Sequence, residues 1–296
     1  MAELLGLDAA FTGFRIVREH PRAAALWALL SVVSSVLFSL FIAATAGPAF
    51  TEMMSLRAGN DPRAVALLMA QLWPVLGGAL VVVFAVYSIV LAAVNRAVST
   101  PDDDRFGYMR LGLEELRQMG LMFMLLVMAL ALYILTVVAA VVIGLIVGPS
   151  GRTAAMALTL VVGLIGALVY FGVRLSLASP LTFAAGKVRL ARSWAMTRGR
   201  FWSMLGIYGL TAALGLTVWF LGFAVISAGV ALAGGGADAL SVIARPDFSS
   251  IAATMSPPRL TYLVLQSALS GLLWPLALSP PIAICRALAA GSGVQR

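Results

Sequence analysis

Reactive side chains are scarce in this sequence of 296 residues, which holds one cysteine, one histidine and one lysine. One cysteine cannot form a disulfide within the chain, and the sequence has neither a CxxC pair nor a Cys/His spacing typical of zinc sites. His20 is the only imidazole, which excludes most zinc and acid–base schemes. Cys285 has no base near it in the sequence, so we interpret it as a small packing residue. We therefore expect no metal, no cofactor and no enzymatic activity.

Acidic residues are missing from the long apolar runs of the chain. All twelve Asp and Glu residues lie outside these runs, whereas ion pathways and proton relays usually place ionisable groups within the membrane. Proton-coupled transport and intramembrane proteolysis by an aspartyl pair are thereby disfavoured. Between Glu115 and Asp238 there is no carboxylate side chain at all, although six basic residues gather in segment 174–200. Either Glu114 and Glu115 reach these cations from elsewhere, or lipid phosphate groups neutralise them.

Apolar residues dominate the chain instead. They make up 61% of it and charged residues 11%, whereas soluble domains run at about 45–50% apolar and 25% charged. A helix of roughly 20 residues crosses the hydrocarbon core of a bilayer. Six apolar runs reach that length: Ala23–Ala46, Val65–Val94, Gly120–Val147, Thr153–Leu177, Ser203–Ala233 and Leu260–Leu288. The sequence predicts an all-α, polytopic membrane protein with six transmembrane helices in a single domain, residues 1–296.

The basic residues are distributed unevenly among the connections between these runs. Fifteen fall on the side that holds both termini, and five fall on the other side. Because Lys and Arg are enriched in cytoplasmic loops, this asymmetry predicts a multi-pass protein of the bacterial inner membrane with both termini in the cytoplasm. The same asymmetry accounts for the net charge of +8, so we expect no nucleic-acid partner.

An aromatic residue followed four positions later by arginine precedes each odd-numbered run. The three pairs are Phe14 with Arg18, Phe106 with Arg110, and Trp194 with Arg198. Residues four apart lie on one side of a helix, so we expect three short amphipathic helices at the cytoplasmic interface, with arginines directed to phosphate groups. The third of these helices is expected to include Phe183 and Trp194 together.

This layout suggests three units, residues 1–97, 98–178 and 179–296, each an interfacial helix followed by a two-helix hairpin. Aromatic belts and snorkelling arginines also arise without any repeat. Both interpretations stay open at this point.

Two cytoplasmic segments resemble a known family. They are Ser193-Trp194-Ala195-Met196-Thr197-Arg198-Gly199-Arg200-Phe201-Trp202 and Phe106-Gly107-Tyr108-Met109-Arg110-Leu111-Gly112. They resemble uncharacterised polytopic bacterial inner-membrane proteins related to the membrane domain of glycerophosphoryl diester phosphodiesterases. The resemblance implies a membrane location and lipid-related work. It carries over no activity, because we do not expect this chain to include the metal-binding catalytic barrel to which such domains are sometimes fused.

Guanidinium groups bind phosphate in a bidentate manner, so the cytoplasmic cations are candidates for lipid headgroup contacts. These candidates are Arg110, Arg174, Lys187, Arg189, Arg192, Arg198 and Arg200. The interfacial aromatic residues that we expect to accompany them are Phe14, Phe106, Trp194 and Trp202. Arg174 is the one charged residue that we expect to lie deep in the membrane, because the sequence stays apolar after it. It either snorkels to the cytoplasmic surface or anchors an anionic headgroup.

Two functions are compatible with these patterns. In the first, a non-enzymatic inner-membrane protein binds, organises or moves lipids, above all anionic ones, through the arginines of its cytoplasmic interface. In the alternative, the chain is a membrane subunit or scaffold of a larger complex, such as a transporter partner, and packs against another membrane protein or a second copy. Glycine faces suit such packing, and they occur at Gly144-x-x-x-Gly148 and at Gly206, Gly209 and Gly215.

Overall fold

The computed structural model describes residues 2–55, 62–101, 105–149, 151–234, 236, 241, 243 and 246–291, and these contain helices and no β-strand. The helices are α1 (Ala2–Glu19), α2 (Pro21–Ser55), α3 (Pro62–Ser99), η1 (Arg105–Tyr108), α4 (Leu113–Val147), α5 (Arg152–Leu175), α6 (Ala178–Ala185), α7 (Leu190–Met196), α8 (Phe201–Ala233), α10 (Ile251–Thr254) and α11 (Pro257–Gly291). Six of them, α2, α3, α4, α5, α8 and α11, are long and apolar enough to cross a membrane. The predicted all-α fold with six spans is therefore confirmed.

Several prolines lie inside these long helices. Pro74 in α3 and three prolines in α11 interrupt neither helix. In α2 the backbone leaves helical geometry at Ala46, with φ −148° and ψ 22°. Pro48 follows two residues later, and its missing N–H and its ring disturb the helical hydrogen bonds of the preceding turn. The C-terminal end of α2 is therefore bent.

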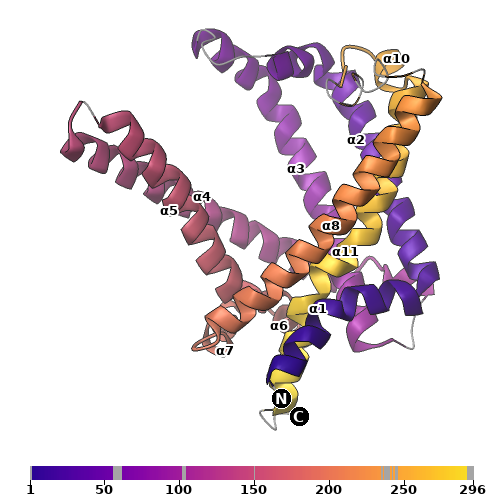
Figure 1. The fold of residues 1–296 in the computed structure, drawn as a ribbon, viewed down its shortest axis with the longest axis vertical. Coiled ribbons are helices and arrows are strands. Elements are labelled where there is room, and N and C mark those ends of the chain that lie inside the picture. The colour runs from indigo at the N-terminus through magenta and orange to yellow at the C-terminus, as the bar shows by residue number, and fades with distance from the viewer. Residues whose placement is uncertain are drawn as a thin grey trace.

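The helix α11 is the centre of the molecule. It packs against α1, α2, α3, α6 and α8, and it is the most buried of the six spans (Figure 1). Two glycines bring the backbones together. A Cβ atom at Gly13 of α1 would collide with the Cα of Leu276, and one at Gly271 of α11 would lie 2.6 Å from the Cα of Ala28 on α2. Glycine therefore sets both helix–helix distances.

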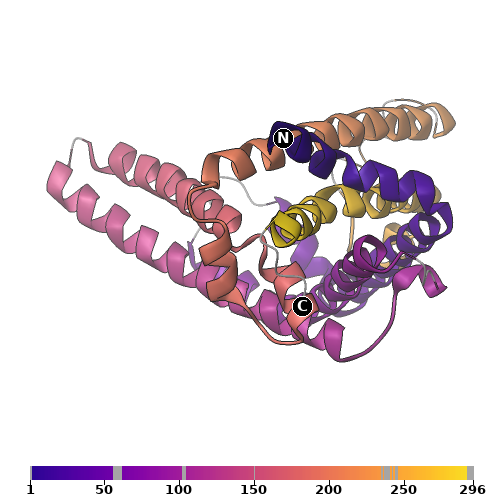
Figure 2. The same ribbon diagram turned by 90° about the horizontal axis from the view of Figure 1, so that it is seen from below.

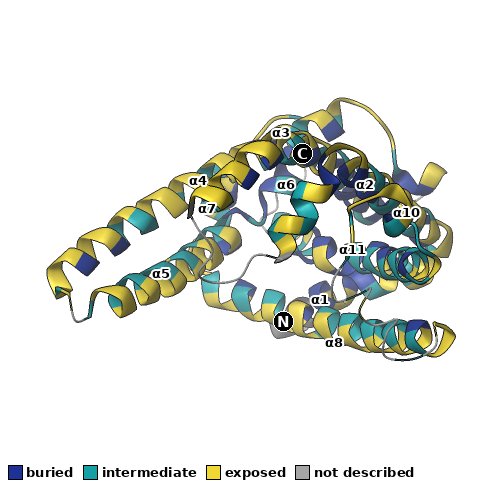
Figure 3. Ribbon diagram, turned by 90° about the horizontal axis from the view of Figure 1, so that it is seen from above, coloured by how far each residue is buried: buried dark blue, intermediate teal, exposed yellow. Residues whose placement is uncertain are grey.

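The α4–α5 hairpin stands apart from this bundle and leaves it at an angle (Figures 1 and 2). Its two helices pack along each other, and α4 joins the bundle through α3 and α6. The glycine face predicted at Gly144 serves this hairpin, since a Cβ there would lie 2.6 Å from the Cγ of Met156, whereas nothing described lies within 4 Å of one at Gly148. Figure 3 shows that most of both helices is exposed, as expected for apolar helices that face lipid.

The short helices α1, η1, α6 and α7 gather at one end of the molecule, where α11 also ends (Figures 1 and 2). We call this the arginine-rich end. Two apolar clusters fill it, one that includes Trp27, Tyr108 and Ile282 and one that includes Met204 and Cys285. Cys285 is buried in the second cluster and so has the predicted packing role.

At the opposite end, the segment 246–254 lies over the bent end of α2, and we call it the outer strap. The ring of Phe248 packs edge-on against Phe50, with 5.1 Å between centroids, and its backbone N–H donates to Thr51 Oγ1 over 3.2 Å. The guanidinium of Arg259 lies 4.3 Å from the Phe248 ring centroid. These contacts join the start of α11 to the end of α2.

The three predicted hairpins occur as neighbouring pairs, because α2 packs against α3, α4 against α5, and α8 against α11. A structural repeat of the units 1–97, 98–178 and 179–296 stays a prediction.

Candidate functional site

Two hydroxyl groups hold the short helix α7 across the end of α5. Ser193 Oγ donates to the backbone carbonyl of Arg174 over 2.9 Å, and Thr197 Oγ1 lies 3.2 Å from the same carbonyl and 3.0 Å from the Ser193 carbonyl; both hydroxyl-bearing residues are buried. The last carbonyls of a helix have no partner within it, so these bonds satisfy one such group. They also place Trp194 of α7 beside the side chain of Arg174.

The Arg174 guanidinium lies beside two aromatic rings that also contact each other, with 5.8 Å between their centroids. Its central carbon is 4.9 Å from the ring centroid of Trp194 and 5.6 Å from that of Tyr170. Its Nε and Nη1 atoms are buried and have no hydrogen-bond partner among the described residues. A guanidinium carries five N–H donors, and leaving buried donors unpaired is costly. Arg174 is therefore held in place by the neighbouring rings and keeps hydrogen-bond donors that no described residue uses.

The other cations of segment 174–200 lie on α7 and in the turns on either side of it. Arg189 is half-buried, and its Nε atom also has no partner among the described residues. The remaining four are exposed: Lys187, Arg192, Arg198 and Arg200. The structure thus gathers six of the seven predicted cations in one region.

The seventh cation and most of the predicted aromatic residues lie elsewhere. Arg110 is exposed beside η1, which packs against α2 and α3 rather than against α5 or α7. Phe106 is 82% exposed and Trp202 is 79% exposed. Phe14 is half-buried in α1, where it keeps its predicted helical spacing to Arg18. Of the four predicted aromatic residues, only Trp194 contacts Arg174.

The predicted interfacial helix at Phe106 is absent. The φ angles at Phe106, Gly107 and Tyr108 are +50°, +63° and +63°, which place all three residues in the left-handed region. Long-range contacts hold this turn, because Trp27 Nε1 donates to the Gly107 carbonyl over 2.9 Å and the Tyr108 side chain is fully buried. Phe106 and Arg110 therefore do not share a helical face. The prediction was wrong because local spacing contains no information about these contacts.

The third predicted interfacial helix is divided in two. Gly186, with φ +63°, ends α6 and separates it from α7. Phe183 and Trp194 consequently lie on different helices, and α7 ends before Arg198. The glycine allows the left-handed conformation that this turn requires, and the turn is what brings α7 back over α5.

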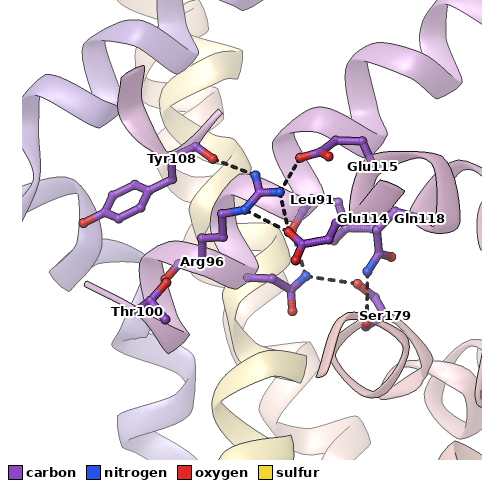
Figure 4. Close-up of polar contacts among 9 residues, drawn as sticks. Leu91, Arg96, Thr100, Tyr108, Glu114, Glu115, Gln118 and Ser179 are labelled. Carbon is purple, nitrogen blue, oxygen red and sulfur yellow. Dashed lines mark hydrogen bonds and ion pairs between the residues drawn. The ribbon is translucent and has the colours of Figure 1, made fainter. Parts of the chain in front are cut away.

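A buried ion-pair cluster lies outside the predicted site (Figure 4). Arg96, near the end of α3, donates from Nη2 to Glu114 Oε2 over 2.5 Å and to Glu115 Oε1 over 2.6 Å, and from Nη1 to the Tyr108 carbonyl over 2.8 Å. The side chains of Arg96 and Glu115 are 8% and 6% exposed. The cluster therefore joins α3, the η1 turn and the start of α4.

Amide side chains extend this cluster to α6. Asn95 Nδ2 donates to Ser179 Oγ over 3.2 Å, and Gln118 Nε2 donates to the Ser179 carbonyl over 3.1 Å (Figure 4). One signal in the sequence pointed to the cluster, namely opposite charges at the end of one apolar run and before the next. That signal was Arg96 on one side and Glu114 and Glu115 on the other.

The cluster tests one of the two ways of neutralising segment 174–200. The ion pairs of Glu114 and Glu115 in the described part of the chain go to Arg96. The expectation that these two acids reach the cations of segment 174–200 is not met. Neutralisation by lipid phosphate groups stays a prediction.

The six apolar helices define the class of this chain, which is a multi-pass membrane protein. Comparisons with family models, with curated proteins and with solved structures found no match to it. Among the residues that the structure describes, no three His, Cys, Asp or Glu side chains lie close enough together to hold a metal ion.

Proposed function

We propose that this chain is a non-enzymatic protein of the bacterial inner membrane that binds anionic lipids at its arginine-rich end and thereby organises or moves them. One observation carries the proposal: the guanidinium of Arg174 lies beside the rings of Tyr170 and Trp194 and has buried donors without a partner among the described residues. A lipid phosphate supplies the acceptors that these donors lack.

The surroundings of Arg174 support a phosphate ligand over a carboxylate of the same chain. The stretch between Glu115 and Asp238 contains no acidic residue, and the acids at the start of α4 already pair with Arg96. The rings of Tyr170 and Trp194, whose centroids are 5.8 Å apart, both lie beside the guanidinium, and neither ring supplies a hydrogen-bond acceptor for its buried donors. The resemblance to membrane domains of glycerophosphoryl diester phosphodiesterases agrees with a lipid headgroup as the ligand.

The orientation of the chain is part of the same proposal. The excess of basic residues at this end supports a cytoplasmic location for it and for both termini. Anionic lipids give the cytoplasmic leaflet a negative surface potential, which attracts basic segments near the membrane. The proposed ligand is therefore abundant on the side where the arginines lie.

The test is the lipid that the purified full chain retains in mild detergent, measured by native mass spectrometry for Arg174→Gln. Arg152→Gln is the matched control, because Arg152 is an exposed arginine at the opposite end of the same helix. We expect the Arg174 variant to retain less anionic lipid than the natural chain, with the control unchanged. Equal retention in a folded Arg174 variant contradicts the proposal.

A second function, as a membrane subunit or scaffold of a larger complex, is favoured by one feature of α8. A Cβ atom at Gly206 or Gly209 would meet nothing within 4 Å among the described residues, which leaves a flat face on which another helix can pack closely. The same mass spectra separate the two functions. A stoichiometric protein partner, or a second copy of the chain, supports the scaffold, whereas bound lipid without such a partner supports lipid binding.

A further inference from the structure

The α4–α5 hairpin and the central helix α11 are separated by hollows rather than packed together. One hollow of about 330 Å³ lies between α3, α4, α5, α6 and α11, and another of about 740 Å³ lies between α5, α8 and α11. Four residues line both hollows: Gly172 and Ser176 on α5 and its end, and Ala277 and Pro281 on α11. The two hollows are thus two sides of one opening, which we call the α5–α11 gap.

The walls of the gap are apolar. No charged residue is among the described residues that line either hollow. The three hydroxyl groups of the larger hollow already donate within the chain: Ser176 to the Val173 carbonyl, Tyr208 to Ser176 Oγ, and Thr211 to the Ile207 carbonyl, over 2.7 to 2.9 Å. These hydroxyl hydrogens are not available to a polar ligand, so the walls favour an apolar one.

The gap is closed toward the arginine-rich end and open sideways. The buried cluster that includes Met204 and Cys285 packs against Leu205 and Tyr208, which line the larger hollow, and so fills the space between the gap and that end. Ala277 is exposed although it lies on the most buried of the six spans. Its exposed surface faces the gap.

We propose that the α5–α11 gap holds an acyl chain of a phospholipid from the surrounding leaflet. An apolar cavity excludes water, and the gap lies between spans, where the solvent is hydrocarbon. A hydrocarbon chain in the gap gains the dispersion contacts that the separated walls of α5 and α11 do not make with each other. This ligand is distinct from the headgroup bound at Arg174, and it uses none of the arginines.

Glycines in the walls allow the gap to be filled by substitution. A Cβ atom at Gly172 of α5 or at Gly215 of α8 would meet nothing within 4 Å, so a leucine at either position extends into the gap without a backbone collision. Gly166 of α5 and Gly209 of α8 are equally open but line neither hollow. The pair Gly172→Leu with Gly215→Leu therefore has a matched control in Gly166→Leu with Gly209→Leu. Leucine favours a helix over glycine to the same extent in both pairs.

The experiment uses the full chain in bilayer nanodiscs of phosphatidylcholine, a fraction of which carries a diazirine in the middle of one acyl chain. After illumination, labelled peptides are mapped by mass spectrometry, and the label at Ala277 is read against that at Val225, an exposed residue of α8 outside the gap. We expect Ala277 to be labelled in the natural chain and in the control pair. The label there should be lost in the gap-filling pair, while Val225 stays labelled in all three.

Three outcomes overturn the proposal. They are an unlabelled Ala277 in the natural chain, equal labelling of Ala277 in the gap-filling pair, and labelling of Ala277 by a diazirine fatty acid but not by the phospholipid. The Arg174→Gln variant distinguishes this proposal from the proposed function. If only headgroup binding fails, the Arg174→Gln variant keeps its anionic lipid while Ala277 is still labelled. If only the gap proposal fails, this variant loses anionic lipid, and the labelling of Ala277 contradicts the proposal in one of the three ways given above.

Discussion

The guanidinium of Arg96 and the carboxylate of Glu115 form an ion pair across 2.6 Å, and both side chains are buried. Glu114 also pairs with Arg96, so both acids at the start of α4 join that helix to α3. The arginines of the arginine-rich end therefore divide into two groups. Arg96 holds the bundle together, whereas Arg174 keeps donors that have no partner among the described residues.

The first prediction concerns the stability of this ion pair. Arg96→Gln leaves the buried carboxylate of Glu115 without its cation, and breaking a buried pair in this way costs about 3–5 kcal/mol. Glu114→Gln should cost less, because the Glu114 side chain is 43% exposed. Unfolding in mixed micelles, followed by circular dichroism, measures both variants. Equal losses of stability in the two variants would show that burial of the ion pair does not determine its contribution to stability.

A second prediction tests the glycine contact between α11 and α2. The Cβ atom of Gly271→Ala would lie 2.6 Å from the Cα of Ala28, so the helices must move apart, and overpacking of this kind typically costs about 1–3 kcal/mol. Gly206→Ala is the control, since its Cβ meets nothing within 4 Å. The same unfolding assay should show a loss for the first variant only. A Gly271 variant as stable as the control would contradict the close approach.

The ring beside Arg174 supports a third prediction. Trp194→Ala removes the nearer of the two rings that hold the guanidinium in position, and a cation–π contact of about 0.5–1 kcal/mol corresponds to a weakening of anionic-lipid binding by about two- to fivefold. Trp202→Ala should change little, because Trp202 is 79% exposed and makes no contact with Arg174. Lipid titrations followed by native mass spectrometry compare the two variants. A larger loss for Trp202→Ala would mean that general interfacial anchoring, and not this contact, determines binding.

A fourth prediction concerns the outer strap, where hydrogen bonds from Ser249 and the nearby charge of Arg259 hold the pKa of Asp247 below its usual value. With a lowered pKa in the folded chain, the ionised carboxylate stabilises the strap above the ordinary value of about 3.9. That contribution is lost as the pH falls through the lowered pKa. Ser249→Ala should raise the pKa of Asp247.

Ser250→Ala should leave the pKa of Asp247 unchanged, because the Ser250 side chain accepts from the Ala253 N–H and caps α10 instead. An NMR titration of the chain with carbon-13-labelled aspartate reads the midpoint directly. The same midpoint in the natural chain and in Ser249→Ala would rule out the Ser249 hydroxyl as a cause of the lowered pKa, since the backbone N–H of residue 249 is kept in that variant.

The spans were predictable from the sequence because the thickness of the bilayer sets the length of an apolar helix. The arrangement of the spans was not predictable in this way. The central position of α11 depends on backbone contacts at Gly13 and Gly271, and an apolar run shows the same composition whether it faces lipid or another helix. For the same reason, the composition of α4 and α5 did not indicate that the hairpin they form stands apart from the bundle.

The candidate site was predictable in its charges but not in its geometry. The absence of acids around segment 174–200 pointed to the cations of this segment, and their role in lipid binding stays a prediction. The position of Trp194 beside Arg174 depends on hydroxyl groups of Ser193 and Thr197 that bind a carbonyl on another helix. Spacing along the chain does not report such contacts, and it also led to the helix wrongly expected at Phe106.

The measurement that tests the account most directly is the sidedness of the arginine-rich end. In a Cys285→Ser background, single cysteines replace Arg198 at that end and Arg152 at the opposite end, both of which are exposed. A maleimide that does not cross membranes is added to intact spheroplasts. We predict that the cysteine at 152 reacts at once and that the cysteine at 198 reacts only after the membrane is permeabilised. Reaction at 198 in intact spheroplasts, with 152 protected, would contradict the account.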